Sequence, residues 1–263
     1  IGAPGYPSYR QILRALSLTP VDIETQSQAK FQPTPQDLND QDLAGLLVAS
    51  PANPTGSILS QSELQALADW AAAQDAAFIS DEIYHGIAYD AAATTALSVT
   101  DRVYVINSFS KYFSMTGWRI GWMVVPPDHV RMIERLAQNM FICPPHASQI
   151  AALAALDAGT ELDANVDMYR ANRALMLDGL RACGITDFVA PDGAFYIYAN
   201  VSHLTDDSLA FASEVLHAAG VAITPGLDFD KTRGHGWVRF SYARSTSDIT
   251  EGLHRITSFL ETR

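Results

Sequence analysis

Short apolar runs alternate along the first half of this chain with segments of helical spacing. The apolar runs predict strands at residues 21–24, 45–50, 77–80, 103–107 and 120–125. Helical spacing marks residues 9–16, and a Ser60-Gln-Ser-Glu63 capping box opens a helix that runs to about residue 73. Strands that alternate with helices favour right-handed crossovers. We therefore expect an α/β fold whose mainly parallel sheet carries helices on both faces.

From residue 145 onward the pattern becomes helical, with a long run over residues 162–183. Strands are then predicted at 188–189, 193–199 and 236–242, and helices at 206–219 and 247–260. This order indicates a smaller α+β domain. We place the boundary near Arg170, which gives a large domain over residues 1–170 and a small domain over residues 171–263.

Composition narrows the class of protein. The 263 residues carry a net charge of −12 without a basic cluster, so nucleic acid is not an expected partner. Cys143 and Cys183 lack metal-ligand spacing, which predicts no metal site and favours a reducing, cytoplasmic location. No apolar stretch reaches the roughly 18 residues that span a bilayer, and the start of the sequence lacks a signal-peptide pattern, so we expect no membrane partner.

Lys111 carries the most chemical information, because this chain has only three lysines. It follows the predicted strand 103–107, is flanked by Ser108 and Ser110, and precedes Arg119 by eight positions. An amine near hydroxyl groups and a guanidinium suits a carbonyl cofactor that carries a phosphate. That description fits pyridoxal 5'-phosphate. The alternative is a solvated loop lysine.

Three polar residues share one position relative to the predicted sheet. Asn53, Asp81 and Lys111 each follow the carboxyl end of a strand. Ligands of open parallel sheets bind at that edge, so these side chains are expected to converge there.

Five segments carry a resemblance to a known family. They are residues 4–9 (PGYPSY), 50–56 (SPANPTG), 80–84 (SDEIY), 108–122 (SFSKYFSMTGWRIGW) and 238–242 (VRFSY). In this order they resemble the class I/II aminotransferases of the fold-type I superfamily that depends on pyridoxal phosphate, over nearly the whole chain. The resemblance implies a cofactor-binding large domain over residues 1–170 and a C-terminal small domain over residues 171–263.

The resemblance also implies roles for the residues at the predicted edge. Lys111 would bond covalently to the cofactor aldehyde and later move a proton at the substrate α-carbon. Asp81 would pair with the pyridine nitrogen, and Tyr84 and Asn53 would hydrogen-bond the phenolic oxygen. A helix-capping or surface carboxylate is the alternative for Asp81, and a packed aromatic ring is the alternative for Tyr84.

The remaining implied roles concern the phosphate, the cofactor ring and the substrate. Ser108 and Arg119, with Ser110 assisting, match phosphate ligands, and Tyr6 matches the aromatic that stacks on the ring. Arg239, with Asn53, would bind the substrate α-carboxylate, because a charge in a strand is costly unless an anion pairs with it. The alternatives are a turn tyrosine at position 6 and an arginine at position 239 that pairs with Asp228 or Asp230.

The chain opens on Ile1-Gly-Ala-Pro-Gly-Tyr-Pro without a preceding strand or helix, so we expect a further N-terminal portion. The resemblance places there a phosphate-binding helix start and a tyrosine that crosses a homodimer, which is the assembly expected of the full-length protein.

Other motif interpretations are weaker. Ser108-x-x-Lys111 also fits penicillin-recognising serine hydrolases, but their other motifs are out of order or incomplete here. Residues 78–85 (FISDEIYH) imitate an ATPase strand, yet no phosphate loop accompanies them. His85 beside Asp81 and Glu82 could suggest a metal, but a second histidine at helical spacing is missing.

The predicted function is therefore transamination between an α-amino acid and a 2-oxo acid in a two-stage exchange. Two alternatives stay open. A carbon–sulfur lyase would use the same lysine, aspartate and arginine, and a regulator could use the fold as a non-catalytic sensor of pyridoxal phosphate. The sequence leaves the amino donor and acceptor undecided.

Overall fold

The computed structural model describes residues 1–38, 42–90 and 92–263. Its chain forms two compact units. Unit 1 comprises Ile1–Pro33, Ala52–Ser57 and Asp167–Arg263, and unit 2 comprises Thr34–Pro51 and Ile58–Val166. The predicted boundary near Arg170 lies close to the point where the chain passes from unit 2 to unit 1. The sequence assigned residues 1–33 and 52–57 to the large domain, and this assignment stays a prediction.

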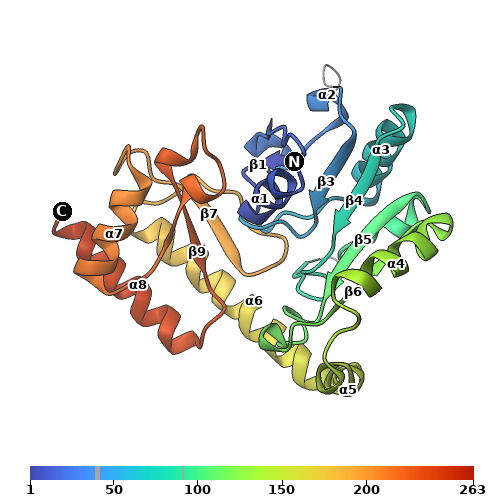
Figure 1. Ribbon diagram of the computed structural model, residues 1–263. Coiled ribbons are helices and arrows are strands. Elements are labelled where there is room, and N and C mark those ends of the chain that lie inside the picture. The colour runs from blue at the N-terminus through green and yellow to red at the C-terminus, as the bar shows by residue number, and fades with distance from the viewer. Residues whose placement is uncertain (39–41, 91) are drawn as a thin grey trace. The chain divides into compact units, whose positions relative to one another are not determined.

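Unit 2 is built on a four-stranded sheet in the order β3-β4-β5-β6 (Figure 1). Its strands are β3 (Gly45–Ala49), β4 (Ala77–Asp81), β5 (Val103–Ser108) and β6 (Gly121–Val124). The first three run parallel, as predicted, and β6 runs antiparallel to β5. The connection from β5 to β6 is the loop 109–120, which contains no α-helix. Because a parallel neighbour needs a long crossover, the chain turns back and β6 pairs antiparallel to β5.

Helix α3 (Gln61–Ala73) begins at the predicted capping box. The Glu63 N–H donates to Ser60 Oγ over 3.3 Å, and Glu63 Oε2 accepts the Ser60 N–H over 2.7 Å. Leu64, Leu67 and Trp70 form its buried face, and the helix packs on β4. The sequence therefore predicted where α3 begins and where it ends.

The other helices of unit 2 are mostly short. They are α2 (Pro35–Leu38), α4 (Val130–Met140), α5 (His146–Ala155) and the start of α6 (Gly159–Ala182), with the 3-10 helices η2 (Ala96–Ser98), η3 (Thr116–Trp118) and η4 (Pro127–His129). Helix α4 was not predicted, although its apolar residues recur at helical spacing. Helix α6 matches the predicted helix 162–183 and continues into unit 1.

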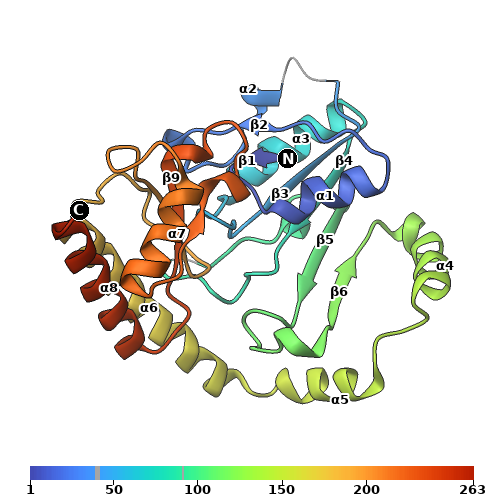
Figure 2. The same cartoon turned by 60° about the vertical axis from the view of Figure 1, so that its left-hand side comes forward.

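Unit 1 contains an antiparallel sheet of order β7-β9-β8, made by Tyr196–Asn200, Trp237–Ser241 and Thr224–Pro225. Helix α7 (Ser208–Ala219) packs on β8, β9 and α8 (Thr246–Glu261). Figure 2 shows α7 beside α8 and β9. The 3-10 helices here are η1 (Ser27–Ala29), η5 (Gly226–Asp228) and η6 (Gly234–Gly236). The predicted strand 188–189 is a single bridge between Phe188 and Ala199.

The first residues of the chain belong to unit 1. Strands β1 (Gly2–Ala3) and β2 (Ile23–Glu24) pair in parallel, and α1 (Pro7–Ala15) lies between them in the sequence. The Arg233 guanidinium binds the Asp230 carboxylate over 2.8 Å and donates to the Thr25 carbonyl over 3.0 Å. This arginine therefore ties the N-terminal segment to the C-terminal segment.

No helix within residues 1–38, 42–90 and 92–263 combines the length and apolar character that crossing a membrane requires.

Candidate functional site

The carboxyl ends of β4 and β5 place two of the predicted site segments side by side. Asp81 is the last residue of β4 and lies opposite Ile106 of β5, two positions before Ser108 ends that strand. One carboxylate oxygen of Asp81 accepts the Ile83 N–H over 3.0 Å. This bond fixes the side chain against the turn that follows β4, in which no helix begins among the described residues.

Lys111 and Tyr84 are brought together within unit 2. The Tyr84 side chain is buried, and the Lys111 ammonium lies 5.4 Å from the centre of its ring. That distance is within the range of a cation–π contact. Lys111 itself is half-buried, which sets it apart from a fully solvated loop lysine.

The loop that carries Lys111 is held by a dense set of hydrogen bonds. Ser108 Oγ lies 2.8 Å from Ser110 Oγ and accepts the Ser110 N–H over 3.0 Å. Thr116 Oγ1 donates to the Ser110 carbonyl over 2.6 Å, and the Ser114 N–H donates to the Lys111 carbonyl over 3.0 Å. The two serine hydroxyls therefore gather at the end of β5, three residues or fewer from Lys111.

Apolar packing anchors the same loop. Phe109 and Met115 are buried with Ala152 of α5, so both ends of the Lys111 segment are fixed in an apolar cluster. Tyr112 lies over Gly86, where a Cβ would come within 2.7 Å of its ring. The Tyr112 hydroxyl donates to the Asp163 carboxylate over 2.7 Å, and this bond raises the pKa of Tyr112 to about 12.

Arg119 does not join this group as a buried ligand. It is exposed, adopts a left-handed backbone with φ of 53°, and donates from Nη1 to the Thr116 carbonyl over 2.8 Å. The guanidinium is thus held against its own loop.

Arg239 and Asn53 meet in unit 1. From β9, Arg239 donates through Nη1 to Asn53 Oδ1 over 2.8 Å and through Nη2 to Thr224 Oγ1 over 3.2 Å. Its guanidinium carbon lies 4.2 Å from the centre of the Tyr196 ring and 4.9 Å from that of Phe229. Two aromatic faces and two polar side chains therefore fix the direction of a partly buried cation.

The other predicted residue of unit 1 is Tyr6. It is exposed and makes an edge-to-face contact with Tyr9, with ring centres 5.4 Å apart. Of the two alternative acids for Arg239, Asp228 and Asp230, Asp230 forms an ion pair with Arg233 over 2.8 Å.

Two residues beside Asp81 have contacts that the sequence did not reveal. The buried Glu82 carboxylate accepts the Ala96 N–H over 2.8 Å and the Ser80 hydroxyl over 3.1 Å. His85 Nδ1 lies 3.4 Å from the other carboxylate oxygen of Glu82. The sequence signal that could have revealed the contacts of Glu82 is its position directly after a predicted buried strand. A buried charge needs a partner.

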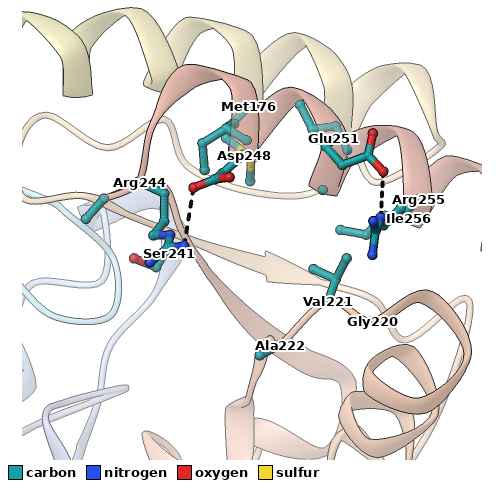
Figure 3. A pocket seen from close by; sticks show the side chains of 14 residues that line it. Met176, Gly220, Val221, Ala222, Ser241, Arg244, Asp248, Glu251, Arg255 and Ile256 are labelled. Carbon is teal, nitrogen blue, oxygen red and sulfur yellow. Dashed lines mark hydrogen bonds and ion pairs between the residues drawn. The ribbon is translucent and has the colours of Figure 1, made fainter.

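A separate pocket of about 610 Å³ lies in unit 1 among α6, α8 and the end of β9 (Figure 3). Arg244 and Arg255 on its wall pair with Asp248 and Glu251 of α8, over 3.3 Å and 2.7 Å. None of the predicted site residues lines it. The pocket is therefore not the site that the sequence predicted.

The donor groups in unit 2 fit a phosphorylated carbonyl cofactor. An amine stands over a buried phenol, two hydroxyls lie at the end of the neighbouring strand, and a carboxylate ends the strand beside it. An aldehyde requires the amine, a phosphate is satisfied by hydroxyl and N–H donors, and a protonated ring nitrogen requires the carboxylate.

Comparisons with known proteins agree with this chemistry. The family model described as aminotransferase class I and II matches residues 1–256. The valine–pyruvate aminotransferase of Mycobacterium tuberculosis is 50% identical over 99% of this chain and 69% of its own length.

Solved structures match as well. A proposed aminotransferase from Silicibacter pomeroyi is 66% identical with a TM-score of 0.98, over 100% of this chain and 71% of its own. An aminotransferase from Mycobacterium tuberculosis is 50% identical with a TM-score of 0.96, over 100% of this chain and 69% of its own.

Proposed function

Because this chain belongs to the class I and II aminotransferase family, we propose that it binds pyridoxal 5'-phosphate through Lys111 and uses Asp81 to activate it. Family membership confirms the predicted α/β fold of type I and the predicted reaction, transamination between an α-amino acid and a 2-oxo acid. Enzymes of this family depend on pyridoxal phosphate. Which residues of this chain hold the cofactor is our proposal.

The placement of Lys111 carries the proposal. Its amine lies over the buried Tyr84 ring, in a loop that starts from the strand next to Asp81. When bound, the cofactor supplies an aldehyde for the amine and a ring that accepts electrons from the substrate α-carbon. The Lys111 amine would also take and return the proton of the substrate α-carbon.

The neighbouring side chains have supporting roles. The Asp81 carboxylate keeps the ring nitrogen protonated, and the Tyr84 hydroxyl and the Asn53 amide donate to the phenolic oxygen. Ser108, Ser110 and Arg119 bind the phosphate, for which Arg119 leaves its Thr116 carbonyl partner. Tyr6 covers one face of the ring.

Arg239 binds the substrate α-carboxylate. The aromatic rings of Tyr196 and Phe229 and the Asn53 amide oxygen support this role, because they hold a guanidinium fork in one orientation.

We propose an amino donor with an apolar side chain and pyruvate as the acceptor. The support is the 50% identity to an enzyme named valine–pyruvate aminotransferase. We further propose a homodimer in the cytoplasm, without nucleic-acid or membrane partners. The net charge of −12 agrees with the lack of a nucleic-acid partner. The two cysteines form no disulfide within the described residues, which agrees with a reducing compartment.

Product analysis tests the reaction and the substrates together. The holoenzyme, given valine and pyruvate, should release alanine and the 2-oxo acid of valine in equal amounts. Aspartate in place of valine should react more slowly. Release of a thiol, ammonia and pyruvate from cystathionine would indicate a carbon–sulfur lyase and would contradict the proposal. An absence of turnover with every donor in an amino-acid panel would favour a sensor.

Replacing Arg239 by leucine should lower kcat/KM for the amino acid by about 10² to 10³-fold, because a buried anion then loses its charged partner. Cofactor affinity should stay near the wild-type value. Arg239→Lys keeps the positive charge but lacks the planar guanidinium. Its kcat/KM should lie between the values of the wild type and Arg239→Leu. Steady-state kinetics with a parallel cofactor titration checks this, and normal turnover by Arg239→Leu would refute the role.

A further inference from the structure

Glu82 is a buried carboxylate at the start of the turn that carries Asp81 and Tyr84. Its side chain is bound by the Ala96 N–H and the Ser80 hydroxyl, over 2.8 Å and 3.1 Å. The first bond ties β4 to η2, and the second ties the carboxylate back onto its own strand. A buried carboxylate with these partners fixes the backbone on both sides of it.

His85 closes the same turn from the other end. Its main-chain N–H donates to the Glu82 carbonyl over 2.9 Å, and its Nδ1 lies 3.4 Å from Glu82 Oε2. The other ring nitrogen, Nε2, is buried and makes no hydrogen bond within the part of the chain that the structure describes. The imidazole therefore contacts Glu82 through Nδ1, while its other nitrogen is buried.

The turn is also tied to the loop of Lys111. The Ile87 N–H donates to the Tyr84 carbonyl over 2.9 Å, and Gly86, with φ of 90°, leaves room for the Tyr112 ring. A change in the position of residues 81–87 would therefore move the Asp81 carboxylate and the Tyr84 ring relative to the Lys111 amine.

We propose that His85 is a positioning residue of this active site, which holds the turn after β4 through its contact with the Glu82 carboxylate and so directs Asp81 and Tyr84 toward the cofactor. This inference rests on the proposed function. His85 itself touches neither cofactor nor substrate in this account, and its effect passes through Glu82 and the backbone.

The charge state of His85 agrees with this role. Burial lowers its pKa below the ordinary 6.5, although the Glu82 and Asp81 carboxylates and the main chain of Ser50 favour the charged ring. Within the described residues, these three residues are the neighbours that act on the charge of the imidazole. The ring is therefore neutral near pH 7, and protonation at lower pH would change the balance of charge beside Asp81.

The test compares two substitutions in the holoenzyme. His85→Asn keeps an N–H donor near the position of Nδ1, and His85→Leu keeps bulk without a donor. His85→Leu should weaken pyridoxal phosphate binding about 10-fold and shift the pH at which the absorbance of the bound cofactor changes. His85→Asn should remain within about two-fold of the wild type in affinity.

A matched control is His129→Asn. His129 is also half-buried in unit 2, and its Nδ1 contacts the Tyr104 hydroxyl at 2.5 Å. This variant should lose stability and keep both cofactor properties of the wild type. If His85→Leu does not fold, His85→Ala takes its place, with the same expectation.

A second measurement does not depend on the cofactor. As the pH falls below about 6.5, the unfolded chain takes up a proton at residue 85 before the folded chain does. The wild-type apoprotein should therefore lose urea stability more steeply than His85→Asn between pH 7.5 and pH 5.5, values chosen to lie about one unit to either side of that pKa.

The possible outcomes distinguish failure of the positioning role of His85 from failure of the proposed function. If the wild type binds pyridoxal phosphate at Lys111 but His85→Leu keeps its affinity and its spectral pH dependence, the positioning role is wrong and the proposed function stands. If His85→Asn and His85→Leu lose the same amount of cofactor affinity, the positioning role is also wrong. The loss would then come from changed packing and not from the lost N–H donor. If the wild type does not bind the cofactor, the proposed function fails and the inference fails with it.

Discussion

Replacing Lys111 by alanine should lower the rate of transamination by at least about 10³-fold and abolish covalent retention of the cofactor. The substitution removes both the amine that bonds to the aldehyde and the group that moves the α-proton, and a positioned acid–base group alone contributes about 10² to 10⁴-fold. Single-turnover kinetics with valine, together with mass spectrometry of the reduced protein, measures both effects.

The control is Lys231→Ala, because Lys231 is an exposed lysine of unit 1. It should keep wild-type rates and wild-type cofactor retention. Lys111→Arg keeps a positive charge but cannot act as a neutral nucleophile near pH 7, so it should be as inactive as the alanine variant. A Lys111→Ala variant that retains a tenth or more of wild-type activity would remove this lysine from the mechanism.

Replacing Asp81 by asparagine should lower kcat by about 10² to 10³-fold while the protein still folds. Asparagine preserves shape and can still accept the Ile83 N–H, but it carries no charge to keep the ring nitrogen protonated. The change should raise KM little, because the lost interaction matters most while charge develops on the ring. Stopped-flow kinetics at several pH values measures this loss.

Asp69→Asn is a suitable comparison for Asp81→Asn. Asp69 lies on α3 and accepts a hydrogen bond from the Gln65 side chain over 2.8 Å, outside the turn and loop of the site. Its replacement should leave kcat unchanged. Equal rates for Asp81→Asn and the wild type would mean that another group protonates the ring.

The sequence predicted the regular part of the fold well because local signals specify it. The apolar runs predicted β3, β4 and β5 to within a residue or two, and the Ser60 capping box predicted where α3 begins. Contacts between distant segments were harder to predict. Residues 1–33 pack with the C-terminal part of the chain through bonds such as that from Arg233 to the Thr25 carbonyl, which no local pattern announces.

The candidate site divides in the same way. A parallel sheet places the ends of neighbouring strands together, so the approach of Asp81 to the Lys111 loop followed from topology. The surroundings of Arg239 depend on Asn53, Thr224 and two aromatic rings from separate segments, and the inward turn of Glu82 depends on Ala96. Side-chain direction of this kind arises only when tertiary packing chooses among rotamers.

Borohydride reduction of the wild-type holoenzyme, followed by peptide mapping, tests the central claim most directly. The reduced cofactor should be attached to the peptide containing Lys111, and peptides containing Lys30 and Lys231 should stay unmodified. Label on either of those two lysines, or a protein that holds pyridoxal phosphate without any fixed label, would contradict it.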